Sequence, residues 1–186
     1  MKQGENAIKQ GDNKQRAYAS TYAEFITVTC LEWKFILEKE KYKQIVIDSL
    51  EYLVKDQRVA IYGFVIMNNH FHLLWQMLGK NNREEVQRDF LKFTAQQILK
   101  GLRNEDTDML SELLVSAKER KYQVWKRNSL GVPLWSENVI VQKLAYIHNN
   151  PVRAGLCKFP EEYKYSSAGF YMINKSDWKF LIHYNG

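Results

Sequence analysis

The pattern of apolar and polar residues indicates β-strands in three stretches of this chain. Residues 25–30 alternate between two faces and are rich in β-branched side chains, and residues 59–66 and 70–76 are similarly apolar. Because successive side chains of a strand point to opposite faces, this pattern predicts three strands. The segment Met67-Asn68-Asn69 is typical of a turn, so we expect the last two strands to form a hairpin.

Elsewhere the apolar residues recur every three or four positions, as they do in amphipathic helices. This spacing predicts helices over residues 40–55, 83–101, 109–119 and 139–149. We expect Gly101 and the pair Asn150-Pro151 to end two of these helices, and residues 131–133 to form a turn. Strands and helices interleave with few linkers, which favours one compact α+β domain.

The predicted domain occupies residues 21–175. Residues 1–20 are rich in Lys, Gln, Asn and Gly and have little apolar periodicity, which indicates a flexible basic arm, and residues 176–186 form a C-terminal tail. The whole chain has 186 residues, of which 45% are hydrophobic and 13% aromatic. This composition is sufficient for a folded core and excludes a wholly disordered chain.

Charge and cysteine content narrow the possible classes of protein further. The longest apolar runs are far shorter than the roughly 18–20 residues that cross a bilayer, and the chain shows no secretory signal. Cys30 and Cys157 match neither a disulfide framework nor a paired zinc motif. We therefore expect a reduced, cytoplasmic protein with no membrane partner. The net charge of +6 favours a polyanionic partner, although many ordinary proteins are as basic.

Two histidines on a predicted strand carry the first chemical signal. In His70-Phe71-His72 the imidazoles share one face of the strand, while Phe71 points to the other. Two adjacent imidazoles form half of a metal site, because neutral imidazole is the commonest side-chain metal ligand. The alternative is an edge strand whose histidines face solvent, and the motif alone does not decide between the two.

A tyrosine on the last predicted helix carries the second signal. Tyr146 and Asn150 lie one turn apart on the same helical face. A phenol can attack phosphorus and form a covalent phosphotyrosine, which conserves the energy of the broken bond for later rejoining. The simpler interpretation is a tyrosine that packs on a helix face.

A basic, aromatic run before residue 128 is the best candidate for a DNA path. Its cations would follow the phosphate backbone while its rings stack on unpaired bases. The alternative is a solvated surface with Trp125 as an anchor in the core. Lys92 is a weaker candidate, and Arg153 is an equal candidate for a phosphate contact and for plain surface. The run contains Lys118, Arg120, Lys121, Tyr122, Trp125, Lys126 and Arg127.

These signals occur together in an order that resembles a known family. The segments FVIMNNHFHLL (64–74) and YIHNNPVRAGL (146–156) resemble the single-tyrosine, His-hydrophobic-His transposases of insertion sequences. The second segment, followed by YKYSS (163–167), resembles in particular their REP-associated branch. Further agreement comes from FLKFT (90–94) and LWSE (134–137), so the resemblance covers about residues 22–172.

The resemblance implies a ferredoxin-like domain with a central antiparallel sheet packed by helices. It implies an enzyme that uses Mg²⁺ or Mn²⁺ and a tyrosine to nick and transfer single-stranded DNA at a hairpin or stem-loop. Residue by residue, His70 and His72 become metal ligands, Asn150 a third polar ligand, and Tyr146 the nucleophile that forms a 5′-phosphotyrosine. Asn69 departs from the pattern, since many relatives have proline there.

Two other functions stay open on the sequence alone. A domesticated relative would bind stem-loop DNA or RNA without cutting it, and a hydrolytic nuclease would activate water at the metal without a tyrosine. A monomer and a homodimer are both compatible with the sequence. We expect the protein to be associated with the nucleoid.

Overall fold

A four-stranded antiparallel sheet forms the centre of the molecule. The computed structural model describes residues 22–117, 120–127, 129, 131–175 and 177–184. The strands are β1 (Glu24–Thr29), β2 (Val59–Ile66), β3 (His70–Met77) and β6 (Gly131–Pro133), in the spatial order β2-β3-β1-β6. The predicted hairpin of β2 and β3 is confirmed.

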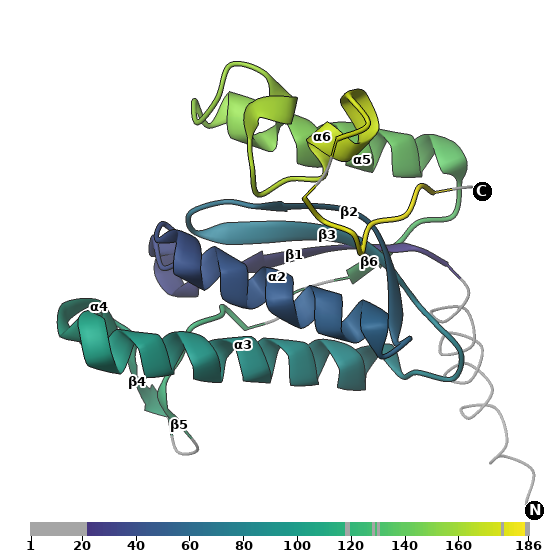
Figure 1. The fold of residues 1–186 in the computed structure, drawn as a ribbon. Helices are drawn as coiled ribbons and strands as arrows, with labels where there is room; N and C mark the ends of the chain where they lie inside the picture. Colours follow the sequence, from purple (N-terminus) through teal and green to yellow (C-terminus); the bar gives the residue numbers. More distant parts are fainter. Residues whose placement is uncertain (1–21, 118–119, 128, 130, 176, 185–186) are drawn as a thin grey trace, which may run out of the picture.

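Two long helices cover one face of the sheet and a third covers the other (Figure 1). Helices α2 (Glu40–Lys55) and α3 (Arg83–Glu105) lie on the first face, and α5 (Glu137–Arg153) lies with the short α6 (Ala168–Met172) on the second. The β1-α2-β2-β3-α3-β6 order with this sheet is ferredoxin-like, so the predicted fold class is confirmed. No helix among the described residues is long and apolar enough to span a membrane.

Short elements complete the chain. The turns η1 (Leu31–Trp33) and η2 (Pro160–Glu162) follow β1 and α5, and α4 (Thr107–Glu112) follows α3. Strands β4 (Leu114–Ala117) and β5 (Arg120–Tyr122) pair as a separate hairpin. The prediction of a helix over residues 109–119 is therefore wrong in its second half, because this segment pairs across the hairpin instead of continuing α4.

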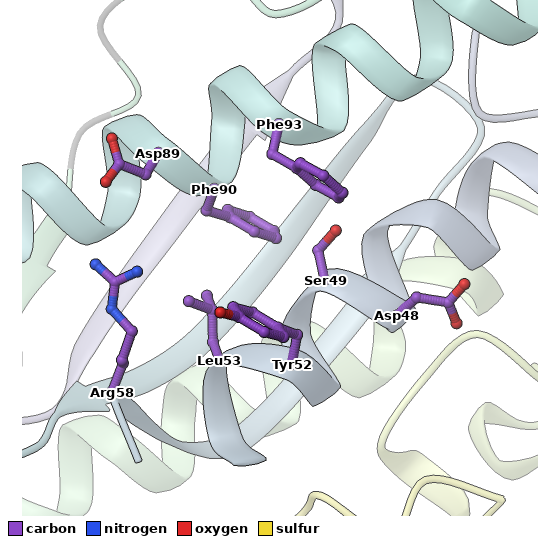
Figure 2. A pocket seen from close by; sticks show the side chains of 8 residues that line it. All are labelled: Asp48, Ser49, Tyr52, Leu53, Arg58, Asp89, Phe90 and Phe93. Carbon is purple, nitrogen blue, oxygen red and sulfur yellow. The ribbon is translucent and has the colours of Figure 1, made fainter. Parts of the chain in front are cut away.

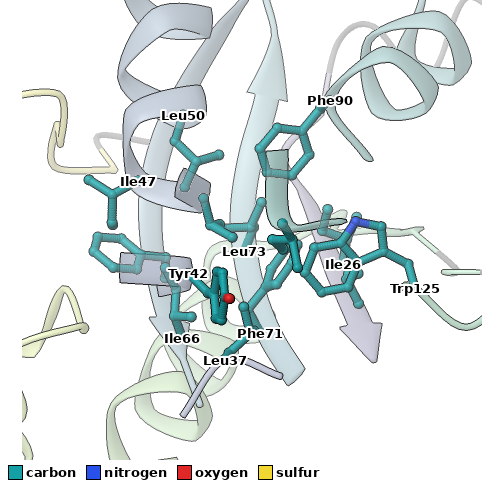
Figure 3. Packing of buried hydrophobic residues seen from close by; sticks show 14 of the residues in the cluster. Ile26, Leu37, Tyr42, Ile47, Leu50, Ile66, Phe71, Leu73, Phe90 and Trp125 are labelled. Atoms are coloured by element: carbon teal, nitrogen blue, oxygen red, sulfur yellow. The ribbon is translucent and has the colours of Figure 1, made fainter. Parts of the chain in front are cut away.

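Both faces of the sheet bury apolar side chains. On one face, Phe71, Leu73 and Trp75 of β3 pack against α2 and α3 in the larger core (Figure 3). On the other, Leu74 packs with Val65 in a smaller core beneath α5. Burial on both sides explains why β2 is almost continuously apolar. The α5 side is the smaller core, and the remaining space on that face holds the polar residues described below.

The structure corrects the predicted end of α3. The helix continues past Gly101 to Glu105. A Cβ at Gly101 would lie 2.9 Å from Cε1 of Tyr42, so the glycine lets α3 approach α2 closely. The residue therefore serves helix packing inside α3 and does not terminate the helix.

The last helix also extends further than predicted. It passes through Pro151, which is buried, and ends at Arg153, four residues beyond the predicted end at residue 149. Gly155, with φ of 69°, then closes the helix: its N–H donates to Val152 O (3.0 Å), and Leu156 N–H donates to Pro151 O (2.9 Å). This left-handed closure is a Schellman motif, which satisfies the final carbonyls.

The turn predicted at residues 131–133 is instead the edge strand β6. It pairs with Glu24–Ile26 at the start of β1. Glu24 is buried and pairs with Arg83 through Nε and Oε2, 2.7 Å apart, and Gly131 leaves room for the Arg83 guanidinium. A distant ion pair therefore lies beside this strand, and no local pattern in the sequence contains it.

The C-terminal residues pack against β2. Tyr163 donates its hydroxyl hydrogen to Ile66 O (2.9 Å), and Ser166 forms an isolated β-bridge with Val65, so this segment packs onto the sheet. Leu181 forms an isolated β-bridge with Ile61, so residues 177–184 of the predicted tail pack with the rest of the domain. The predicted arm, residues 1–20, and Lys118 lie outside the described residues.

Gly63 offers a test of how closely α5 lies on the sheet. A Cβ at this position would lie 2.5 Å from Leu144 Cδ2 and 3.3 Å from Ser167 Oγ. We expect Gly63→Ala to destabilise the fold by about 1–3 kcal/mol, the usual cost of overpacking. Urea unfolding measures this loss. In the Gly63→Ala/Leu144→Ala double variant the loss should be smaller than the sum of the two single losses; strict additivity would contradict the contact.

Candidate functional site

His70 and His72 lie side by side on the α5 face of β3. Their ring centroids are 4.9 Å apart, and the two residues pair across the sheet with Thr29 and Thr27 of β1. The shared face expected from the sequence is therefore present. The strand alternation fixes it, because Phe71 between them is buried in the opposite core.

His72 is buried and holds one nitrogen without a partner. The Thr27 hydroxyl oxygen lies 2.8 Å from Nδ1 of His72, whereas Nε2 of His72 has no hydrogen-bond partner. Burial, followed by the nearby charges of His70 and Lys143, lowers the pKa of His72 to about 3. The imidazole is thus neutral near pH 7. When the proton of this neutral ring is on Nδ1, the lone pair of Nε2 is free to accept a hydrogen bond or to bind a metal.

His70 is less buried and is held by two asparagines. Its Nδ1 lies 2.7 Å from Oδ1 of Asn69, and the Asn150 side chain also forms a hydrogen bond with it. Burial lowers the pKa of His70, and the bond to Asn150 opposes this shift. Asn69 therefore orients the ring, a contact that a proline at this position would not make. The Trp33 ring also lies against His70 in an edge-to-face arrangement, with centroids 5.7 Å apart.

Tyr146 brings a phenol to the same place from α5. Its ring centroid lies 5.2 Å from that of His72 and 6.0 Å from that of Phe25, and the side chain is 39% exposed. The structure thus brings together all four residues predicted for the chemistry, His70, His72, Asn150 and Tyr146. The phenol remains open to solvent and to a substrate.

Two cations flank Tyr146. Nζ of Lys143 lies 4.7 Å from the ring centroid of Phe25 and 5.9 Å from that of Tyr146, and the Arg153 guanidinium lies 5.9 Å from the Tyr146 ring. Lys143 and Arg153 therefore both place positive charge next to the Tyr146 ring. Of the two interpretations of Arg153, its position beside Tyr146 favours the phosphate contact.

A buried histidine fastens α5 to the sheet two residues after Tyr146. Nε2 of His148 lies 2.9 Å from Oγ of Ser167, and this hydroxyl also accepts the Phe64 N–H at 3.0 Å. The ring is buried, and burial lowers the pKa of His148 to about 4. His148 is therefore a structural residue that fastens α5 to the sheet.

This burial predicts acid sensitivity of the helix that carries Tyr146. A histidine has a pKa of about 6.5 in the unfolded chain, and His148 titrates only near 4 in the fold. The fold therefore has its full stability above about pH 6.5 and loses up to about 1.4 kcal/mol per pH unit as the pH falls toward 4. Urea unfolding at several pH values measures the slope. His148→Gln should reduce it without removing it, because His72 titrates over the same range; an unchanged slope would contradict the assignment.

The donor set fits a metal ion, although only with an amide or a substrate oxygen as a further ligand. Among the described residues, no group of three or more His, Cys, Asp and Glu side chains could hold a metal. The unpartnered Nε2 of His72 beside His70 is the orphaned atom that a metal would satisfy. Asn150 is in reach of His70. Thr27 orients the His72 ring and Asn69 orients the His70 ring, each through the Nδ1 atom. Groups outside the ligand shell orient histidine ligands in this way in metal sites.

Trp125 does not join the predicted DNA path. It is buried in the α3 core, and its Nε1–H donates to Leu91 O and Thr94 Oγ1, both at 3.1 Å. The ring is therefore an anchor, which is the alternative that the sequence left open. Lys92 is exposed on α3, across the sheet from the histidines, so the structure does not bring it to the site either.

The other candidates of the basic run divide into two groups. Lys121 and Tyr122 belong to β5 of the separate hairpin. Lys126 and Arg127 are exposed, and Lys126 N–H donates to Thr29 O at 2.7 Å, next to His70 on the sheet. Thr29 itself pairs with His70, so the backbone of Lys126 lies one strand away from that histidine. Lys126 is therefore the member of this run closest to the candidate chemistry.

A cavity of about 410 Å³ lies between α2 and α3, on the opposite side of the sheet (Figure 2). Phe90, Phe93 and Tyr52 line it, with Arg58 at one side. None of the predicted site residues lines this cavity. It is therefore separate from the histidine and tyrosine cluster.

Comparison with known proteins finds the same fold in a solved structure. Neither a protein-family model nor a curated protein matches the sequence. Among solved structures, a REP-associated tyrosine transposase bound to a REP hairpin matches with a TM-score of 0.62 and 16% identity over 100% of both chains. A candidate transposase from Deinococcus radiodurans R1 matches with a TM-score of 0.45 and 13% identity, over 80% of this chain and 97% of that one. The first similarity establishes the fold, and it is to the same group that the motifs resemble.

Three further residues shape the site and were not predicted from the sequence. Thr27 and Asn69 orient the imidazoles, and Trp33 lies against His70. Alternation along residues 25–30 puts Thr27 on the polar side of its strand, which is a usable signal. No local pattern marks Trp33, because the turn that carries it depends on pairing with residue 124.

Proposed function

We propose that this protein is a metal-dependent single-strand DNA transposase that nicks and transfers DNA at hairpin-bearing sites. The observation that carries the proposal is the position of the Tyr146 ring 5.2 Å from His72, which in turn lies 4.9 Å from His70. A phenol, two neutral imidazoles and two cations converge at one solvent-accessible place. Both Tyr146 and the histidines come from the same chain.

Each residue of the site has a defined part in this reaction. Lys143 and Arg153 hold the negatively charged phosphate beside the phenol, and Lys126 receives the adjoining backbone. A bound Mg²⁺ or Mn²⁺, held by His70, His72 and Asn150, would supply electrostatic stabilisation of charge on the phosphate oxygens. Because Mg²⁺ prefers oxygen ligands, a site with two imidazoles should use Mn²⁺ at least as well.

The chemistry at phosphorus is a transesterification. The Tyr146 oxygen attacks the phosphate, loses its proton to solvent and forms the Oη–P bond, while the bond from phosphorus to the 3′-oxygen breaks. The 3′-oxygen takes up a proton and leaves as a 3′-hydroxyl, and a 5′-phosphotyrosine remains. Attack by another 3′-hydroxyl reverses these steps, rejoins a strand and restores Tyr146 without ATP.

A covalent protein–DNA adduct is the decisive product. We would mix the protein with pooled, hairpin-bearing single-stranded oligonucleotides and Mn²⁺, and separate the products on a denaturing gel. An adduct supports the transposase. Cleavage without an adduct supports a hydrolytic nuclease, and binding without cleavage across the pool and both metals supports a stem-loop binding protein.

A further inference from the structure

Trp33 is a large exposed side chain at the edge of the candidate site. It ends the turn η1, directly after β1, and is 53% exposed. Its ring meets that of His70 edge to face, with centroids 5.7 Å apart and an interplanar angle of 75°. The indole thus lies against a proposed metal ligand, and about half of the residue's surface remains open to solvent.

The backbone that presents this ring has an uncommon conformation. Glu32 and Trp33 have φ of 51° and 59°, a left-handed region that bulky residues rarely adopt. The turn is fixed by backbone hydrogen bonds from Trp33 N–H to Cys30 O (3.1 Å) and from Leu31 N–H to Val124 O (2.7 Å). Such strain persists only where surrounding contacts hold it, and it concentrates at binding sites.

We propose that Trp33 stacks on an unpaired base next to the phosphate at which Tyr146 reacts. This inference rests on the proposed function, because it takes that phosphate to lie between Tyr146 and the histidines. A ring in contact with His70 reaches only the base of the nucleotide that carries the phosphate, or of its immediate neighbour. Stacking suits every base, so Trp33 holds single-stranded DNA in register without reading its sequence.

The surroundings favour a DNA base over a protein surface. The turn follows Thr29 and Cys30, whose backbone pairs with Trp125 and Lys126. Lys126 is exposed beside this strand end, so a cation lies near the backbone path that the ring would accompany. Alternating cations and exposed aromatic rings are the usual means of binding single strands.

The test compares binding in a background that cannot cut. All proteins carry Tyr146→Phe, and the probe is a fluorescein-labelled DNA hairpin with a short single-stranded thymidine flank, measured by anisotropy in EDTA. We expect Trp33→Ala to weaken binding by roughly 5- to 150-fold, the range for one stacked base, and Trp33→Phe to retain most of the affinity. Phe93→Ala is the matched control, since Phe93 is 52% exposed on α3, across the sheet.

Abasic substitutions in the flank identify stacking specifically. With Trp33 present, removing one base next to the bound phosphate should weaken binding about as much as Trp33→Ala does, and in the Trp33→Ala protein the same removal should have no further effect. A structural role of Trp33 would instead weaken the blunt and the flanked hairpin equally. Equal affinity of parent and Trp33→Ala would overturn the inference while leaving the proposed function intact. Absence of any hairpin binding by the parent would overturn both.

Discussion

Tyr146→Phe is expected to abolish the covalent protein–DNA adduct and to lower strand cleavage by on the order of 10³-fold or more. The substitution removes one oxygen and keeps the ring that packs against His72 and Phe25, at 5.2 and 6.0 Å. Since no other described tyrosine lies in ring contact with the histidine pair, none can replace this nucleophile. A denaturing gel with labelled hairpin oligonucleotides and Mn²⁺ measures both quantities.

The same variant should bind DNA nearly as well as the parent, because Lys143, Arg153 and Lys126 remain. Tyr52→Phe is the matched control: Tyr52 is 61% exposed on α2, across the sheet, and its loss should leave the adduct unchanged. Persistence of the adduct in Tyr146→Phe would refute this nucleophile. Loss of DNA binding together with the adduct would point to a folding defect, which circular dichroism would detect.

Local periodicity in the sequence was sufficient to predict most of the fold. Helix α2 and strand β2 have the predicted bounds, because each buries its apolar face along its whole length. The two histidines were predictable for the same reason, since alternation on β3 needs only the strand itself. Phe71 and Leu73 fill one core, so His70 and His72 must face the other side.

Features that depend on distant partners were not predictable. Strand β6 forms because Glu24–Ile26 offer an open edge. Trp125 resembles a stacking residue in its basic run, but its Nε1–H is satisfied inside the α3 core. The proximity of Tyr146 to His72 likewise depends on tertiary packing. It requires α5 to lie close on β2, which the missing side chain of Gly63 permits.

Removal of His72 should separate metal binding from stability. In the fold without metal, His72 is 3% exposed and its Nε2 has no hydrogen-bond partner, so this nitrogen does not stabilise the fold. His72→Phe keeps a buried ring and loses the Nδ1 contact with Thr27, a net cost of about 1 kcal/mol. We therefore expect the metal-free Tm to fall by only a few degrees.

Mn²⁺ should then distinguish the two proteins clearly. A metal at about 100 times its Kd stabilises the parent by about 2.7 kcal/mol, which raises Tm by roughly 5–10 °C in a chain of this size. His72→Phe should show none of this rise and no cleavage, because the lone pair that binds the metal is gone. Thermal unfolding with and without Mn²⁺, repeated in the presence of hairpin DNA, measures the difference. His183→Gln, which removes an exposed histidine stacked on Phe170, is the control and should keep the full rise. A rise that survives in His72→Phe would place the metal elsewhere, and the imidazole pair would then serve the phosphate directly as hydrogen-bonding groups.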